Sequence, residues 1–465
     1  MRASVGGKTR SWLRCASMTP IGPPPVVTRP SVLPRGVLAG YALGSLVTGA
    51  FGTVPGLLLL PYLTDTLGVA AGVSGLLVLL PKAWDVLVNP LAGRISDRRG
   101  SRRPFLLVAG VLLSVLFAAV FAAPFAGEGV SAAYVAVAFL LAATAYAFFQ
   151  VPYVAMPAEL TDGYAERTRL MTWRVAVLAC AILISGAVAP LVVDATGGGR
   201  AGHRWSGLFV GLLIAVGTLA TFAGTRKAPS RTAQAAEPSL SAQLRVASGN
   251  APFRALLLCW IVQAAGIGTM LAGVQYFADH VIHQKAGGTF LFAAFVGPAL
   301  LVMPLWTRVG RRHGKLRSLI AGSLLFAAGA LTLLASPAVP PVVVYLLVAV
   351  VGAGYAGQQV FAMAMLPDCI AHDTARTGRR QAGVFTGLWT AGETLGLALG
   401  PGIYAVVLQL SGYVSSATGE AAAQDSTARL GVLLGFTVLP AMLVGVAVLL
   451  LRGYREAGVP LPSEP

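Results

Sequence analysis

A series of long apolar stretches restricts the fold of this chain more than any other feature of its sequence. Each stretch runs for roughly 20 residues or more, which is enough for an α-helix to cross the ~30 Å hydrocarbon layer of a bilayer. Hydrophobic residues make up 56% of the chain and charged residues only 11%, a balance that a single soluble core does not require. The sequence therefore predicts an all-α, multi-pass protein embedded in a lipid bilayer.

Twelve of these stretches are expected to be transmembrane helices, because lipid offers no partner for the polar groups of an irregular backbone. Their predicted ranges are 36–63, 69–96, 104–125, 130–158, 170–194, 206–224, 252–280, 287–307, 316–336, 340–366, 381–413 and 429–451.

Basic residues are distributed unevenly around these spans. If the N-terminus is inside, nearly all of the 34 Lys and Arg residues lie in the two tails or in and beside the loops that follow even-numbered spans. The exceptions are Lys82, Arg200, Arg204, Lys285 and Arg429. The positive-inside rule then places both termini in the cytoplasm, with the protein in the inner (plasma) membrane of a bacterium. We interpret the net charge of +17 as an orientation signal, and expect no nucleic acid partner.

Two loop motifs occur twice, once in each half of the chain. The segment Pro90–Gly100 after the second span recurs as Pro304–Gly314 after the eighth, and a Pro and Arg pair after the fourth span recurs after the tenth. This duplication is typical of the major facilitator fold, in which two six-helix halves rock about a midplane site. The predicted domains are a disordered tail (1–35), an N-terminal half (36–224), a linker (225–251), a C-terminal half (252–451) and a C-terminal tail (452–465).

The cysteines and histidines give no sign of a metal or redox site. The four cysteines show no paired spacing, and the sequence predicts neither a metal ion nor a cofactor. His280 and His283 fall near the outer end of the seventh span, where we expect surface residues rather than ligands or proton relays. Translation could start at Met1 or at Met18, since nothing before Met18 predicts structure.

An acid within the second span is the strongest sign of function. Asp85 has Lys82 one helical turn before it and Asn89 one turn after, so the three side chains share one face of a helix. A carboxylate at bilayer depth costs about 3 kcal/mol on insertion scales, and therefore indicates a cation or proton site beside a polar cavity. The alternative is an Asp85–Lys82 ion pair that stabilises the bundle without coupling.

The loop Gly93–Pro104 resembles the segment between helices 2 and 3 that marks the major facilitator superfamily. In that superfamily an acid and several arginines join helix ends in one conformational state and separate in the other. The matching gating residues here are Asp97, Arg94, Arg98, Arg102 and Arg103. These arginines could also serve orientation alone.

Three further segments resemble the glycoside-pentoside-hexuronide:cation symporters, the melibiose permease-like family of this superfamily. They are Lys82–Pro90, then Pro152–Asp162 with Glu166–Leu170, and finally Pro367-Asp368 with Gly383–Trp389 and Leu395–Pro401. The likeness extends in order from Leu38 to about Leu451. It implies a secondary active transporter of a sugar, glycoside or related polar metabolite, working by alternating access.

The resemblance implies that Asp85 binds the coupling cation. The second acid usual in the family is Asn89 here, and a neighbouring Asn is Val88. Sodium prefers several oxygen ligands, so these replacements make sodium coupling less favoured than proton coupling, with Lys82 tuning the proton affinity of Asp85.

The family's sugar-binding acids are also replaced. They match Gly49 and Gln150, while a lysine of the eleventh helix matches Thr394, next to an unexpected Glu393. Helix geometry places Glu393 near the midplane, like Asp85. Arg174 is then the expected partner for Glu393 or for an anionic solute, or else only a charge at the cytoplasmic edge.

A polar cavity between the halves would complete the transporter. We expect its wall to include Gln150, Tyr153, Gln263, Gln358, Gln359 and Trp389, because amides both donate and accept and aromatic rings stack on sugars. Buried glutamines can also simply link helices. The prediction is a proton-coupled symporter that is monomeric and not an enzyme. The alternative is a proton-driven exporter of a hydrophobic or antibiotic-like metabolite.

Overall fold

The computed structural model describes residues 33–98, 103–125, 127–161, 164–226, 228, 248–284, 287–378, 382–416 and 423–456, and these are almost entirely helical. The first group of helices is α1 Arg35–Leu43, α2 Ser45–Val54, η1 Pro55–Leu59, η2 Tyr62–Thr66, α3 Ala71–Arg98, α4 Arg103–Val120, α5 Glu128–Leu160, α6 Tyr164–Ala195 and α7 Gly199–Thr225. The second group is α9 Ala251–Phe277, η3 Ala278–Ile282, α10 Gly287–His313, α11 Lys315–Thr332, η4 Leu333–Ala338, α12 Pro341–Thr377, α13 Ala382–Leu410, α14 Ser426–Leu450 and α15 Arg452–Glu456.

Eleven helical segments in the described part of the chain are long and apolar enough to cross a membrane. The twelfth helix is α3, which has 28 residues and begins with the apolar segment Ala71–Pro81. Lys82 and Asp85 follow this segment, and apolar residues resume at Val86. With α3 included, the bundle has the twelve helices that the sequence predicts, most of them within a few residues of the predicted ends.

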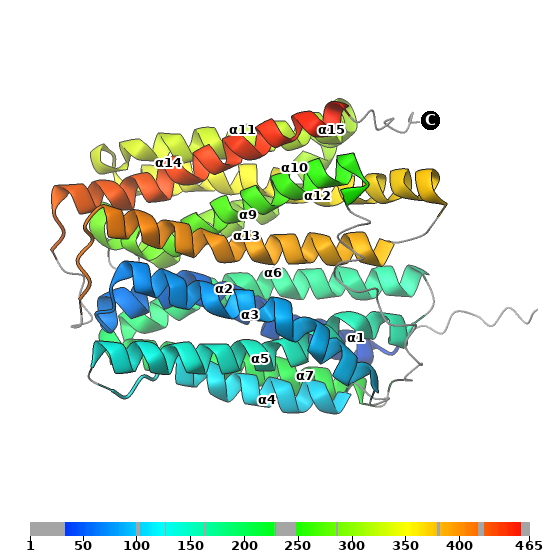
Figure 1. The fold of residues 1–465 in the computed structure, drawn as a ribbon, viewed down its shortest axis with the longest axis horizontal. Helices are drawn as coiled ribbons and strands as arrows, with labels where there is room; N and C mark the ends of the chain where they lie inside the picture. Colours follow the sequence, from blue (N-terminus) through cyan, green and yellow to red (C-terminus); the bar gives the residue numbers. More distant parts are fainter. Residues whose placement is uncertain are drawn as a thin grey trace, which may run out of the picture.

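The helices form two side-by-side groups (Figure 1). Helices α1 to α7 lie in the lower half of the view and α9 to α15 in the upper half, with α3 and α6 of the first group against α13 and α10 of the second. Close helix crossings rely on small residues, as is common in membranes. A Cβ atom on Gly224 of α7 would lie 2.7 Å from the Cα of Gly40 of α1, so only glycine permits this crossing.

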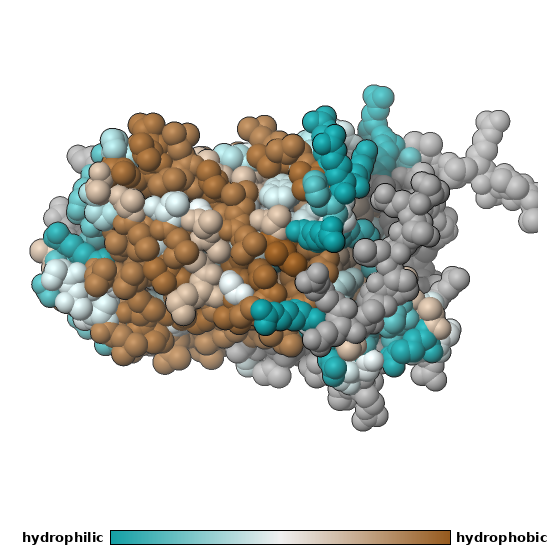
Figure 2. Space-filling view, turned by 90° about the horizontal axis from the view of Figure 1, so that it is seen from above, coloured by the Kyte–Doolittle hydropathy of each residue, from teal (hydrophilic) through white to brown (hydrophobic). Residues whose placement is uncertain are grey.

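The surface carries a broad apolar belt with polar residues at both ends (Figure 2). Large apolar side chains are exposed within it, including Leu212 at 65% and Leu301 at 82%. Such exposure would be costly in water and is expected of side chains that face lipid. The belt supports the interpretation of a multi-pass membrane protein.

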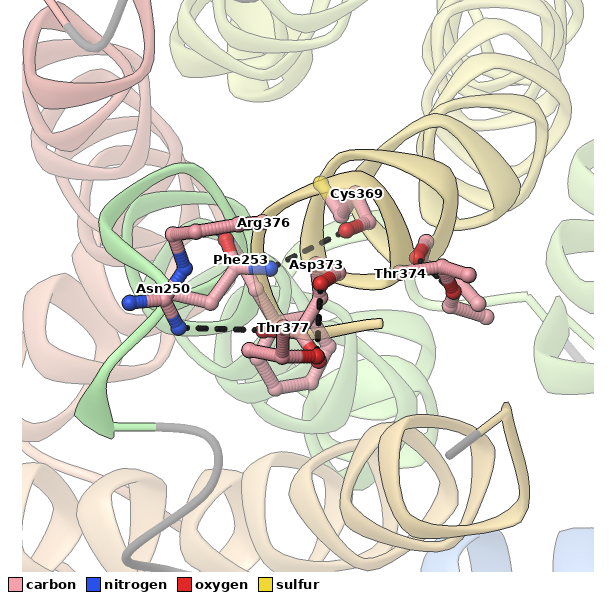
Figure 3. Close-up of polar contacts among 8 residues, drawn as sticks. Asn250, Phe253, Cys369, Asp373, Thr374, Arg376 and Thr377 are labelled. Atoms are coloured by element: carbon pink, nitrogen blue, oxygen red, sulfur yellow. Dashed lines mark hydrogen bonds and ion pairs between the residues drawn. The ribbon is translucent and has the colours of Figure 1, made fainter. Parts of the chain in front are cut away.

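The two ends of the bundle differ in how the groups are joined. We call the end that holds Arg35 and the last described residue, Glu456, the termini end. There the Asn250 amide, just before α9, donates to the Cys369 carbonyl of α12 (3.0 Å), and Arg376 pairs with Asp373 within α12 at 3.1 Å (Figure 3). The hydrogen bonds between the groups that the described residues make lie at the opposite end.

That opposite end, which we call the Asp65 end, holds every hydrogen bond between the two groups that is found among the described residues. Tyr413 donates to Asp65 (2.9 Å), and the hydroxyls of Thr64 and Tyr276 are 2.7 Å apart. Further bonds join Gly72 to Gln409, Val69 to Ser415, Thr64 to Ser416 and Ala187 to Thr289. The groups are therefore closed against each other at the Asp65 end.

Candidate functional site

A pocket lies within the second group of helices. Three helices form its wall, and we call it the Glu393 pocket. Its lining consists of Trp260, Gln263, Ala264 and Ile267 of α9, Tyr355, Gln358 and Gln359 of α12, and Glu393 and Leu397 of α13. Three of the predicted cavity residues, Gln263, Gln358 and Gln359, thus come together around the predicted deep acid.

Polar atoms in and beside this pocket are left without protein partners. Gln263 donates from Nε2 to Ser323 (2.9 Å), but its Oε1 has no hydrogen bond, and neither does Nε2 of Gln358. Trp260 and Trp389 stack with ring centroids 4.8 Å apart, and both indole N–H groups are buried and unbonded. Unsatisfied buried groups are costly, typically about 1–3 kcal/mol each, so their convergence favours a site that a polar ligand completes.

Glu393 is the one charged residue in the lining of this pocket. Its carboxylate makes no hydrogen bond or ion pair within the described part of the chain, although its charge acts on Tyr355. Both Glu393 and Arg174 are described, and they form no ion pair in this conformation. The predicted Glu393–Arg174 pair is therefore not present here.

Among the lining residues that the sequence did not predict, two are aromatic, Trp260 and Tyr355. Each lies three positions before a predicted glutamine, Gln263 or Gln358, and residues three apart share one face of a helix. Helical spacing from the glutamines could therefore have found both. Trp389, which was predicted, reaches the site through its stack on Trp260.

Arg174 and Asp85 both lie in the first group of helices. Its guanidinium carbon is 5.3 Å from the centroid of the Tyr153 ring, and the hydroxyl of Tyr146 experiences the charges of both Arg174 and Asp85. Asp85 is buried, with 6% of its surface exposed. We call Asp85, Tyr146, Tyr153 and Arg174 the Asp85 site.

Tyr153 fixes the position of this site rather than opening onto the pocket. Its ring is fully buried and stacks on Tyr41 at 4.8 Å, and its hydroxyl donates to the Tyr41 carbonyl (2.9 Å) and bonds to Ser45 (3.0 Å). Two tyrosines and a serine thus hold the surface on which Arg174 rests.

The remaining predicted site residues are more scattered. Asn89 is exposed while Val88 is buried, and the side chain of Lys82 lies outside the described part. Gln150 is half-buried with its Oε1 unbonded, and Thr394 is half-buried but does not line the Glu393 pocket. Their roles stay predictions.

The predicted gating loop is described only in part. Arg103 donates to the carbonyls of Arg226 (3.0 Å) and Ala228, which ties the start of α4 to the residues just after α7. The side chains of Arg94, Asp97 and Arg98, and the whole of Arg102, lie outside the described residues.

The contacts at the Asp65 end include a histidine that the sequence analysis placed wrongly. His283 is exposed as predicted, but His280 is 7% exposed, and its Nε2 lies 2.9 Å from the Tyr413 hydroxyl. Since that hydroxyl donates to Asp65, His280 donates to Tyr413. Burial raises the pKa of the Asp65 carboxyl to about 7, against hydrogen bonds from Tyr413 and Thr64 that lower it.

The chain matches one protein-family model over nearly its whole length. Residues 40–455 fit the family described as MFS/sugar transport protein. The chain belongs to this family. The resemblance to the glycoside-pentoside-hexuronide:cation symporters is confirmed by the same match, and with it the twelve-helix major facilitator fold.

Individual relatives cover most of the chain at low identity. YagG of Escherichia coli (strain K12), a candidate glycoside/cation symporter, is 26% identical over 428 residues, which are 90% of this chain and 91% of that protein. The isoprimeverose transporter of Lactiplantibacillus pentosus is 22% identical over 449 residues, or 94% and 92% of the two chains. This family member is therefore a secondary transporter and not an enzyme.

A solved structure shares the fold. A mutant of the nucleoside transporter NupG superposes with a TM-score of 0.66 at 14% identity, covering 89% of this chain and 98% of the other. At this identity the likeness shows the fold alone.

Proposed function

We propose that this protein is a proton-coupled symporter that carries a small hydroxylated solute, such as a sugar or glycoside, by alternating access. The observation that carries the proposal is the Glu393 pocket, where indole and amide groups without protein partners surround a cavity. Sugars offer hydroxyl groups to amides and apolar faces to stacked rings. The relatives named as a glycoside/cation symporter and an isoprimeverose transporter point to the same solute class.

Asp85 is the proposed proton carrier. It is buried within α3, and its charge and that of Arg174 both act on Tyr146. The exposed side chain of Asn89 and the apolar Val88 leave few oxygen ligands for a sodium ion. A single carboxylate can exchange a proton without such ligands. Lys82 is proposed to tune it.

The two groups of helices are the proposed moving halves, 36–224 and 252–451, and the termini end is proposed to face the cytoplasm of a bacterial cell. The hydrogen bonds that join the groups at the Asp65 end then correspond to a transporter closed to the outside. Opening requires these bonds to break while new contacts form at the termini end, where Asp97 and its neighbouring arginines are proposed to act.

Uptake into proteoliposomes tests the function. Vesicles carrying the protein receive either an inward proton gradient or an inward sodium gradient, and labelled monosaccharides and glycosides are assayed for accumulation. We expect accumulation with the proton gradient alone, and Asp85→Asn to abolish accumulation while leaving solute exchange intact. Accumulation driven only by sodium, or undiminished in Asp85→Asn, would contradict the coupling.

The alternative of an exporter for hydrophobic metabolites gains no support from the polar lining of the Glu393 pocket. The same vesicles separate the two functions. Efflux of hydrophobic dyes without uptake of any sugar would favour the exporter.

A further inference from the structure

The charge of the Glu393 pocket narrows the solute class further. Among the residues that line it, Glu393 is charged and none is basic. No hydrogen bond or ion pair satisfies this carboxylate within the described part of the chain. Glu393 is half-buried in this wall, and a carboxylate with no basic neighbour in the lining favours a ligand that brings the opposite charge.

The aromatic wall suits the same ligand. Trp260 and Trp389 form an indole stack, with planes 18° apart, and Trp260 lines the cavity next to Gln263. The face of an indole attracts cations, and most strongly where water is excluded. A carboxylate combined with an indole face is a typical arrangement for binding an ammonium group.

The amides around the carboxylate require hydroxyl groups on the ligand. Oε1 of Gln263 can accept and Nε2 of Gln358 can donate, and both atoms are buried without partners.

Resting on the proposed function, we propose that the Glu393 pocket recognises a protonated amine on a hydroxylated ring, so that the transported solutes are amino sugars or similar amine-bearing polyols. Glu393 binds the ammonium group and the Trp260–Trp389 stack packs against it. Gln263 and Gln358 bind hydroxyl groups.

Binding of matched sugars to the purified, full-length protein tests this assignment. The probes are glucosamine, glucose and N-acetylglucosamine, followed by galactosamine and galactose, with affinity measured by isothermal titration calorimetry. We expect each amino sugar to bind about tenfold or more tightly than its neutral counterparts. N-acetylglucosamine keeps the substituent but not the charge, so it is expected to bind no better than glucose.

Two variants test whether Glu393 causes the preference for amino sugars. Glu393→Gln is expected to bring the affinity for glucosamine down to that for glucose, whereas Glu393→Asp keeps most of the preference. A thermal unfolding curve like that of the wild type shows that each variant is folded. Equal binding of neutral and amino sugars, no binding of any amino sugar, or a preference that survives in Glu393→Gln would overturn the proposal. Proton-driven uptake of a neutral sugar would still support the symporter, so the two proposals can fail separately.

Discussion

Asp85 and Glu393 are two deep acids placed in opposite halves of the bundle, and their surroundings differ. The charges of Asp85 and Arg174 both act on Tyr146, and the guanidinium of Arg174 lies over the ring of Tyr153. Glu393 lines a cavity with indoles and amides and has no basic residue among its lining neighbours. An acid near a fixed positive charge can exchange a proton within the protein, whereas an acid without one calls for a charge brought by the ligand. On this basis proton coupling is assigned to Asp85 and solute recognition to Glu393.

A third acid, Asp65, belongs to neither site and lies where the two groups of helices are closed against each other. In the closed arrangement it faces Tyr413 and Thr64, with Asp279 acting on it from η3, and its pKa is about 7 instead of 3.8. The closed state therefore holds the proton more tightly than an open state that exposes Asp65 to water. Closure is favoured fully below about pH 3.8 and loses this contribution as the pH rises through about 7, by at most about 4 kcal/mol.

Spin labels on Glu128 and Ser426, at the Asp65 end of the two groups, would report this change as a distance that lengthens between pH 5 and pH 8. Asp65→Asn is expected to reduce the pH dependence and to leave solute accumulation coupled to protons. Loss of proton coupling in Asp65→Asn would mean that Asp65 takes part in coupling together with Asp85.

Removing the indole stack is expected to have a smaller effect on solute binding, and only in the Glu393 pocket. Trp389→Ala removes the partner of Trp260 and is expected to weaken solute binding by about 1–2 kcal/mol, roughly a factor of ten. Trp389→Phe keeps a ring and most of the affinity. Trp84→Ala is the matched control on the helix of Asp85, where an exposed indole bonds to Thr144, and calorimetry should find its affinity unchanged.

The glutamines offer the finest test. Gln358→Leu removes a buried donor of the pocket and is expected to cost about 1 kcal/mol of solute affinity, or roughly fivefold. Gln150→Leu removes an unbonded amide from the other half, where no lining of the Glu393 pocket is found. A titration in which Gln150→Leu weakens binding more than Gln358→Leu would place the solute nearer to the Asp85 half.

The fold follows closely from the sequence because lipid leaves a long apolar segment few alternatives to a helix. Span limits such as 287–307 and 252–280 needed little revision against Gly287–His313 and Ala251–Phe277. The family motifs then predicted the fold and the transporter class, both of which are confirmed.

The sites were predictable in part. Gln263, Gln358 and Glu393 were found because polar residues in apolar spans are conspicuous, but Trp260 and Tyr355 look like ordinary lipid-facing or core aromatics until the helices are packed. Contacts between residues on different helices were harder to predict. The sequence suggested Arg174 as a partner for Glu393, but position along a span does not determine which helices face each other. The burial of His280 depends on Tyr413, 133 residues away, and no local pattern predicts such a contact.

Proton movement during solute transport tests the division of labour between the two acids most directly. Proteoliposomes containing a pH-sensitive dye and the wild type, Asp85→Asn or Glu393→Gln protein would receive solute at concentrations scaled to each affinity. We predict solute-driven proton entry for the wild type and for Glu393→Gln at raised solute concentration, and none for Asp85→Asn although it still binds and exchanges solute. Proton entry that persists in Asp85→Asn and disappears in Glu393→Gln would contradict the assignment and exchange the roles of the two acids.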